Sequence, residues 1–240
     1  MTIVDTSGRP LLDIEDWAKL YDTPRISHQW KKGRSAYSVA EFIFNRDGLE
    51  HIGRRASEVL GTPLNIEKAV PEYEVRFDEY GRGRVHDLGI YAKTQNSETV
   101  FVGVEAKVDE SFGGTILDSY LDAKAKQICG VSTNAPQRIE KLLGQHFLVP
   151  SRDMFDVRYQ LLYATIGTIA AKADHSILYV LVFRTDLYSE TKSAENYRDY
   201  VYFMEKVGAI PFKIADGQVQ GHEIKFDGTP LKCIYEYIDT

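Results

Sequence analysis

Alternating apolar and polar residues at positions 84–110 predict two β-strands joined by a polar turn at residues 94–98. If the turn is centred on Asn96, Asp87 lies opposite Glu105 across the antiparallel pair. The apolar side of the pair predicts a core face formed by Leu88, Ile90, Ala92, Val100, Val102, Val104, Ala106 and Val108. The other side carries Asp87, Gly89, Tyr91, Glu105 and Lys107. The hairpin therefore predicts charged side chains gathered on one face of a sheet.

The rest of the chain predicts one more strand before this hairpin, several helices and three later strands. Residues 72–78 alternate as a strand, so residues 72–108 form a predicted three-strand antiparallel meander. The nearly continuous apolar run at residues 176–183 is typical of a central strand covered on both faces, and residues 219–226 and 231–238 predict two edge strands. Helices are predicted at residues 35–60 with a break at Gly48, and at residues 116–129, 135–147, 153–173 and 194–207. We therefore expect an α/β (α+β) fold in which helices flank a mixed central sheet.

The length of 240 residues fits one domain, and a hydrophobic content of 43% can supply its core. We expect this single domain to span residues 1–240, with its core at about residues 35–185. Residues 1–34 are expected to add an N-terminal helix and a basic loop, and residues 186–240 a C-terminal helix and strands.

The basic loop, residues 25–34, contains Trp30 among four cationic residues: Arg25, Lys31, Lys32 and Arg34. One interpretation is a solvated turn whose tryptophan is anchored in the core. The other is a loop that contacts phosphates and stacks its aromatic ring on a base. The sequence leaves both open.

The net charge of −6 gives no global sign of nucleic-acid binding, so any basic surface has to be local. Cys129 and Cys233 lie far apart and match no metal-ligand spacing, which favours structural thiols in a reducing compartment. The N-terminus lacks the basic start and apolar run of a signal peptide, and the longest apolar runs are too short for a membrane span. We expect a cytoplasmic protein without a membrane segment.

Asp87 and Glu105 are the strongest candidates for a functional site. Directly opposed residues of an antiparallel pair have Cβ atoms roughly 4.5–5.5 Å apart, and two carboxylates at that distance repel each other. A divalent metal ion between them turns this repulsion into binding, and Lys107 follows on the same face. If the turn before the hairpin keeps apolar residues on the core face, Glu74 adds a third carboxylate.

Asp87 followed by the triplet Glu105-Ala106-Lys107 resembles the PD-(D/E)xK nuclease superfamily, whose fold is called restriction-endonuclease-like. In that pattern an Asp on the second core strand precedes a Glu-x-Lys on the third. The order of helix, three-strand meander, helix and parallel strand over about residues 35–185 is similar to the core of that fold. The sequence departs from the motif at His86, where the family often has Pro. The resemblance implies metal-dependent hydrolysis of DNA phosphodiesters.

The resemblance also implies a role for each residue of the motif. Asp87 and Glu105 correspond to the acidic metal ligands, the carbonyl of Ala106 to a further ligand, and Lys107 to the family's lysine. Many members add an acidic residue from the first helix, for which Glu41 is the candidate. Mg²⁺, with Mn²⁺ as a substitute, is the implied cofactor.

Two further roles follow from position in the same comparison. Gln160 corresponds to the Gln or Arg that many members carry on the helix after the third strand. Asp109 and Glu110, just past the strand, are candidates for holding a second ion. The chemistry is consistent, because Mg²⁺ bound by hard oxygen ligands offsets phosphate charge and activates water, while a nearby lysine orients that water or stabilises developing charge.

Each of these residues also has a structural interpretation. Glu105 and Lys107 can form an ordinary exposed pair on a sheet, although burying such charges without a function is costly. Glu41 can cap a helix together with Ser38, Glu74 can be a charge at a strand edge, and Gln160 can bond to backbone.

We therefore predict a Mg²⁺-dependent nuclease acting on DNA, for which restriction, phage defence and repair are compatible roles. Cutting both strands of a duplex at once needs two sites, so a homodimer is compatible with this prediction. The alternative is a catalytically silent member of the same fold that binds nucleic acid or a protein. A third hypothesis, accidental resemblance, is favoured if Asp87 and Glu105 point to opposite faces.

Overall fold

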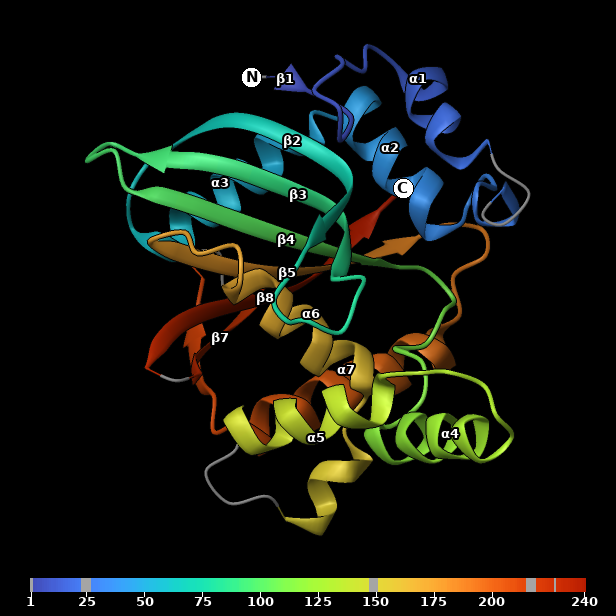
Figure 1. Cartoon of the computed structure of the whole chain (residues 1–240). Helices are drawn as coiled ribbons and strands as arrows, with labels where there is room; N and C mark the ends of the chain where they lie inside the picture. Colours follow the sequence, from blue (N-terminus) through green and yellow to red (C-terminus); the bar gives the residue numbers. More distant parts are fainter. Residues whose placement is uncertain (1, 23–26, 147–150, 215–218, 227) are drawn as a thin grey trace.

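The computed structural model describes residues 2–22, 27–146, 151–214, 219–226 and 228–240. Within them, one mixed sheet has the strand order β1-β2-β3-β4-β5-β8-β7-β6 (Figure 1). The strands are β1 Thr2–Ile3, β2 Leu64–Val75, β3 Arg84–Thr94, β4 Thr99–Lys107, β5 His175–Arg184, β6 Ile210–Lys213, β7 Gln220–Phe226 and β8 Thr229–Asp239. The α-helices are α1 Ile14–Ala18, α2 Ser35–Asn45, α3 Gly48–Leu60, α4 Ile116–Ile128, α5 Ala135–His146, α6 Tyr159–Ile169 and α7 Glu190–Lys206.

Helices cover both faces of the sheet. Buried residues of α1, α2 and α3 pack on one face and form the first hydrophobic core. Buried residues of α4, α5, α6 and α7 pack on the other face and form the second core (Figure 1). Strands β2, β3 and β4 are antiparallel, whereas β5 and β8 continue the sheet in parallel with β4. The predicted α/β fold, with a mixed sheet and an antiparallel meander between helices, is confirmed.

The predicted register of the central hairpin is also confirmed. Leu88 pairs with Val104, Ile90 with Val102 and Lys93 with Thr99, as a turn centred on Asn96 requires. The apolar face expected for this pair is buried in the first core. The central run at residues 176–183 is β5, whose interior is buried on both faces as expected.

Two element boundaries and the edge position of two strands differ from the prediction. The strand predicted at residues 72–78 is β2, which already begins at Leu64. Its early part is not recognisable from alternation because the register shifts between Ile66 and Lys68. The helix predicted at residues 153–173 is interrupted, and a 3₁₀ turn at Arg152–Asp156 is followed by extended Val157 before α6 begins at Tyr159. The two predicted edge strands, β7 and β8, are both interior: β8 pairs with β5 and β7, and β7 pairs with β8 and β6.

The sheet parts between β3 and β4, and this fork positions the candidate site. The pairing of β3 with β4 ends at Leu88 and Val104. Beyond that point β3 stays paired with β2 as far as Arg84, and β4 stays paired with β5 as far as Lys107. Asp87 and Glu105 are therefore the first residues beyond the point where the two strands separate.

Across the described ranges, the longest and most apolar helices still fall short of what crossing a membrane requires.

Close packing of α6 against β4 predicts the effect of a single methyl group at Gly103. A Cβ atom there would lie 2.7 Å from Thr168 Oγ1 and 2.8 Å from the His86 ring. We expect Gly103→Ala to lower the free energy of unfolding by about 1–3 kcal/mol, because the helix has to shift or the ring has to move. Urea unfolding measures this difference.

The matched control is Gly144→Ala in α5, where a Cβ atom meets nothing within 4 Å. This substitution should leave stability unchanged or raise it by up to about 1 kcal/mol, since alanine favours helix. Equal stability of Gly103→Ala and the wild type would contradict the tight contact between α6 and β4.

Candidate active site

Asp87 stands at the fork between β3 and β4. The backbone N–H of Ala106 donates a hydrogen bond of 2.6 Å to Asp87 Oδ2. This carboxylate replaces the strand carbonyl that would accept the bond if the two strands stayed paired. The position of Asp87 is therefore fixed by the need to satisfy the backbone of β4.

Glu105 lies on the side of the sheet that α6 covers, and it is only 2% exposed. Lys107 Nζ donates to Glu105 Oε1 over 2.7 Å, and Gln160 Nε2 donates to the same oxygen. Lys107 also lies 3.3 Å from Gln160 Oε1. The other oxygen, Oε2, is paired with Arg84. The structure thus brings together Glu105, Lys107 and Gln160, because α6 begins at Tyr159 and presents Gln160 in its first turn.

The third carboxylate near the fork is Glu72, where Glu74 was expected. The pairs Pro71 with Leu88 and Tyr73 with His86 enclose Glu72 and set it opposite Asp87. Tyr21 donates a hydrogen bond to Glu72. The two glutamates share a face by alternation, so the pairing register of β2 decides which of them reaches the site.

Glu74 lies two residues farther along β2 and stabilises the turn between β2 and β3. It accepts a 2.9 Å hydrogen bond from the Gly83 backbone N–H and pairs with Arg76 over 3.2 Å. These contacts lower the pKa of Glu74. The structure gives this side chain a role in closing the β2–β3 turn and does not bring it to Asp87.

The carboxylates at the fork are unequally balanced by cations. Burial, together with the charges of Glu105 and Glu72, raises the pKa of Asp87 from 3.8 to about 8. Burial also raises the pKa of Glu72. Burial acts in the same direction on Glu105, but Arg84 and Lys107 more than offset it, so the pKa of Glu105 is lowered. The charges of Asp87 and Glu72 are thus less fully compensated by nearby cations than the charge of Glu105.

A cleft of about 480 Å³ opens onto Asp87 from the side of α2. It is lined by Tyr21, Gln29, Lys31, Arg34, Ser35, Ala36, Glu72, Asp87 and Glu110. Glu110 is fixed there by Ser35 Oγ at 2.9 Å and the Val108 N–H at 2.8 Å, and Arg34 pairs with Asp109 over 3.0 Å. Carboxylates and cations therefore line the same cleft.

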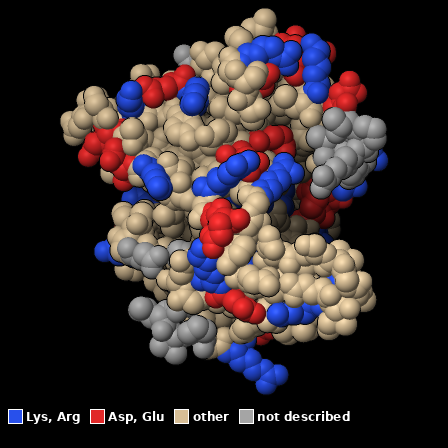
Figure 2. Space-filling model, viewed as in Figure 1, with Lys and Arg blue, Asp and Glu red and all other residues tan. Residues whose placement is uncertain are grey.

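The basic loop combines features of both interpretations. Trp30 is packed between Tyr21 and Tyr37, with ring centroids 5.1 Å and 5.5 Å away, so it is anchored as the first interpretation expects. Lys31 and Arg34 nevertheless line the cleft, while Arg25 lies outside the described residues. Figure 2 shows Lys and Arg interspersed with Asp and Glu on the face in view.

Glu41 is not among the residues that line this cleft. Helix α2 begins at Ser35 and presents Ser35 and Ala36 to it, whereas Glu41 is farther along the helix. Ser38 is buried inside α2 and is not its N-cap, so the capping role considered for Glu41 is not formed either. Glu110 and Glu72 occupy the cleft where an acidic residue from the first helix was expected.

A search for metal-binding groups finds no set of three His, Cys, Asp or Glu side chains within the described ranges. Glu105 is turned toward Arg84, Lys107 and Gln160 on the α6 side, whereas Asp87 lines the cleft beside α2. The expected opposed pair of carboxylates on one face of the sheet is therefore not formed, and this separation favours the hypothesis of accidental resemblance. The chemistry of the donors nevertheless suits a hard cation, because Asp87 and Glu72 are carboxylates whose charges are incompletely compensated. The residues fit such an ion by donor type.

Arg84 and Glu72 are site residues that the sequence reasoning did not select. Alternation puts Arg84 on the same side as Leu88, in the first core, but in the structure Arg84 lies against Gly167 of α6 and contacts Glu105. The left-handed backbone of Glu72, with φ 49°, marks an irregularity in β2. Pro71 was the one available signal that β2 is irregular near this point.

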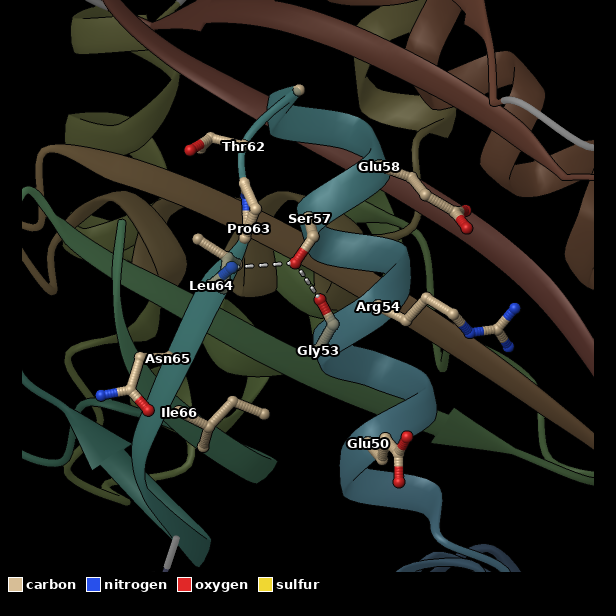
Figure 3. Close-up of a pocket in the computed structure, with 11 residues that line it drawn as sticks. Glu50, Gly53, Arg54, Ser57, Glu58, Thr62, Pro63, Leu64, Asn65 and Ile66 are labelled. Carbon is tan, nitrogen blue, oxygen red and sulfur yellow. Dashed lines mark hydrogen bonds between the residues drawn. The ribbon is translucent and has the colours of Figure 1, made fainter. Parts of the chain in front are cut away.

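Another cavity lies away from the fork, between α3 and the start of β2 (Figure 3). Its volume is about 700 Å³, and Ser57 in its wall accepts a 3.1 Å hydrogen bond from the Leu64 N–H and donates to the Gly53 carbonyl. Ile66 in this cavity and Glu72 at the fork are about 20 Å apart along the strand. This cavity is therefore separate from the carboxylate cluster.

The fold and the site together define an α/β protein that carries a carboxylate–lysine cluster at a fork in its sheet. The family model described as a domain of unknown function (DUF6946) matches residues 10–238, so the chain belongs to that family. Comparisons with curated proteins and with solved structures gave no match. The function of this chain therefore has to be inferred from its sequence motif and from the geometry of its site.

The raised pKa of Asp87 predicts a pH-dependent difference in stability between the wild type and Asp87→Asn. Because the folded protein holds this proton more tightly than the unfolded chain, the wild type loses stability as pH rises from about 4 to about 8. The loss is up to about 1.4 kcal/mol per pH unit. Asparagine does not titrate, so Asp87→Asn should lack this contribution.

Urea unfolding in EDTA at pH 5, 6, 7 and 8 measures the effect. The advantage of Asp87→Asn over the wild type should grow with pH and should disappear toward pH 4. A constant difference across this range would show that the proton affinity of Asp87 does not change on folding.

Proposed function

We propose that this protein is a Mg²⁺-dependent nuclease that hydrolyses DNA phosphodiester bonds. The observation that carries the proposal is the fork between β3 and β4. Asp87 lies on one branch, and Glu105 and Lys107 lie on the other, with Gln160 bonded to both of the latter. What supports the resemblance to the PD-(D/E)xK superfamily is the position of the motif residues on the two adjacent branches, and not a shared face of the sheet.

Asp87, Glu105 and the carbonyl of Ala106 would hold the ion, with Glu72 close enough to add charge. A Mg²⁺ ion supplies positive charge that offsets the phosphodiester and lowers the pKa of a bound water. Asp87 is positioned for this role by the Ala106 N–H. Glu41, Glu74 and the pair Asp109 and Glu110 are not needed for this ligand set.

Lys107 is the proposed group that orients the attacking water or stabilises developing negative charge. Lys107 is only 5% exposed. Its ammonium group donates to Glu105 and Gln160 and lies 5.1 Å from the centroid of the Phe112 ring. A fixed cation in a site that excludes bulk water stabilises charge more strongly than a mobile one. Gln160 is a positioning residue, since it contacts both partners.

Substrate binding would depend on local cations, because the whole chain carries a net charge of −6. Lys31 and Arg34 line the cleft above Asp87 and can contact phosphates on either side of the cleaved bond. A homodimer would supply two sites for a duplex. The free thiols of Cys129 and Cys233 agree with the cytoplasmic location that we propose.

The decisive substitution is Glu105→Gln, which keeps the shape of the side chain and removes its charge. We expect a loss of Mg²⁺-dependent cleavage of about a hundredfold or more. The assay compares circular DNA, linear DNA and RNA with Mg²⁺, Mn²⁺ or EDTA. Glu140→Gln on α5, where the carboxylate accepts a hydrogen bond from Tyr120, is the matched control and should cut like the wild type.

Undiminished cutting by Glu105→Gln, with circular dichroism equal to the wild type, would remove Glu105 from the active site. Cleavage that persists in EDTA would remove the metal from the proposal.

The second candidate is a member of the same fold that binds nucleic acid without cutting it. The pairing of Glu105 with Arg84 favours this candidate, because it ties one proposed ligand to a protein cation. A gel shift in Ca²⁺, beside the cleavage assay in Mg²⁺, separates the two. Binding in Ca²⁺ without cleavage in Mg²⁺ or Mn²⁺ identifies the silent binder.

A further inference from the structure

Arg84 is the least expected member of the cluster at the fork. Its guanidinium contacts Glu105 Oε2, and the two side chains are 11% and 2% exposed. Lys107 already pairs with the other oxygen of Glu105 over 2.7 Å. One buried carboxylate therefore has two protein cations, while Asp87 and Glu72 beside it have less compensation.

The surroundings of Arg84 form a niche that accommodates this side chain. A Cβ atom on Gly167 of α6 would lie 2.5 Å from Arg84 Cβ and 2.7 Å from Arg84 Cγ. Any larger residue at position 167 would push the Arg84 stem away from the helix. The glycine on α6 and the carboxylate on β4 thus hold Arg84 between them.

When no metal ion is bound, Arg84 compensates part of the buried charge of Glu105. Burying a carboxylate without compensation costs several kcal/mol. The guanidinium offers a fixed pair of N–H donors to such a group. Arg84 therefore stabilises Glu105 in the orientation that the structure has.

This same contact opposes the binding of a divalent ion. For Glu105 to share an ion with Asp87, its Oε2 has to give up the guanidinium, and two cations on one oxygen repel each other. We propose that Arg84 is an internal counter-cation of Glu105, which a divalent ion must displace, and that it lowers the affinity of the site for that ion. This inference rests on the proposed metal site at Asp87 and Glu105.

The test measures metal binding without any substrate. Mn²⁺ is titrated into metal-free wild type, Arg84→Gln, Arg76→Gln and Asp87→Ala, and bound Mn²⁺ is followed by electron paramagnetic resonance and calorimetry. We expect Arg84→Gln to bind Mn²⁺ about tenfold more tightly than the wild type or better, which is the effect of removing one charged hydrogen bond. Arg76→Gln is the control, since Arg76 pairs with Glu74 at the surface, and its dissociation constant should not change.

Arg84→Lys covers the case in which the glutamine variant does not fold. Lysine keeps the positive charge but lacks the planar donor pair, so Arg84→Lys should bind Mn²⁺ more tightly than the wild type. Unchanged or weaker Mn²⁺ binding by these variants would overturn the inference, and weaker binding would make Arg84 a residue that positions Glu105.

Comparing Mn²⁺ binding by the wild type and by Asp87→Ala tests the metal site independently of Arg84. If the wild type binds Mn²⁺ and Asp87→Ala does not, the proposed site stands whatever the Arg84 variants do. If no variant binds Mn²⁺, including Arg84→Gln and Arg84→Lys, both the site and the inference fail.

Discussion

The separation of β3 from β4 is the constraint on which the candidate site depends. Wherever two paired strands part, their facing N–H and C=O groups lose their partners, and buried polar groups have to find others. Here the Ala106 N–H is satisfied by the carboxylate of Asp87. The side chain that completes the backbone of β4 is thus the same one that resembles a metal ligand, so structure and proposed chemistry are joined at one residue.

The distribution of charge follows from the same separation. On the α6 side, Glu105 is surrounded by Arg84, Lys107 and Gln160, and its charge is favoured. On the α2 side, Asp87 and Glu72 face a cleft, and burial together with the charge of Glu105 raises the pKa of both groups. The carboxylates on the α2 side are incompletely compensated and therefore favour the binding of a cation. The proposed nuclease chemistry requires such a cation.

Distant segments are required to build this arrangement. Tyr21, from the 3₁₀ turn Lys19–Tyr21 after α1, donates to Glu72 on β2. Gln160 comes from α6, and Ser35 from the start of α2 holds Glu110. The family model, which covers residues 10–238, includes all of these segments. The site is therefore a property of the whole fold, and a fragment limited to the central hairpin would lack most of its contacts.

The amino-acid sequence alone determined the central hairpin, because apolar alternation and a polar turn leave one register that buries Leu88 and Val104. That register was enough to identify Asp87, Glu105 and Lys107 as candidates. The sequence did not reveal the choice of Glu72 over Glu74, which depends on how β2 pairs with β3. It also did not reveal Arg84, because strand periodicity puts Arg84 in the first core, whereas in the structure it lies against α6 and contacts Glu105. Only the tertiary structure decides such points, since forks and the approach of α6 arise from contacts between residues far apart in the chain.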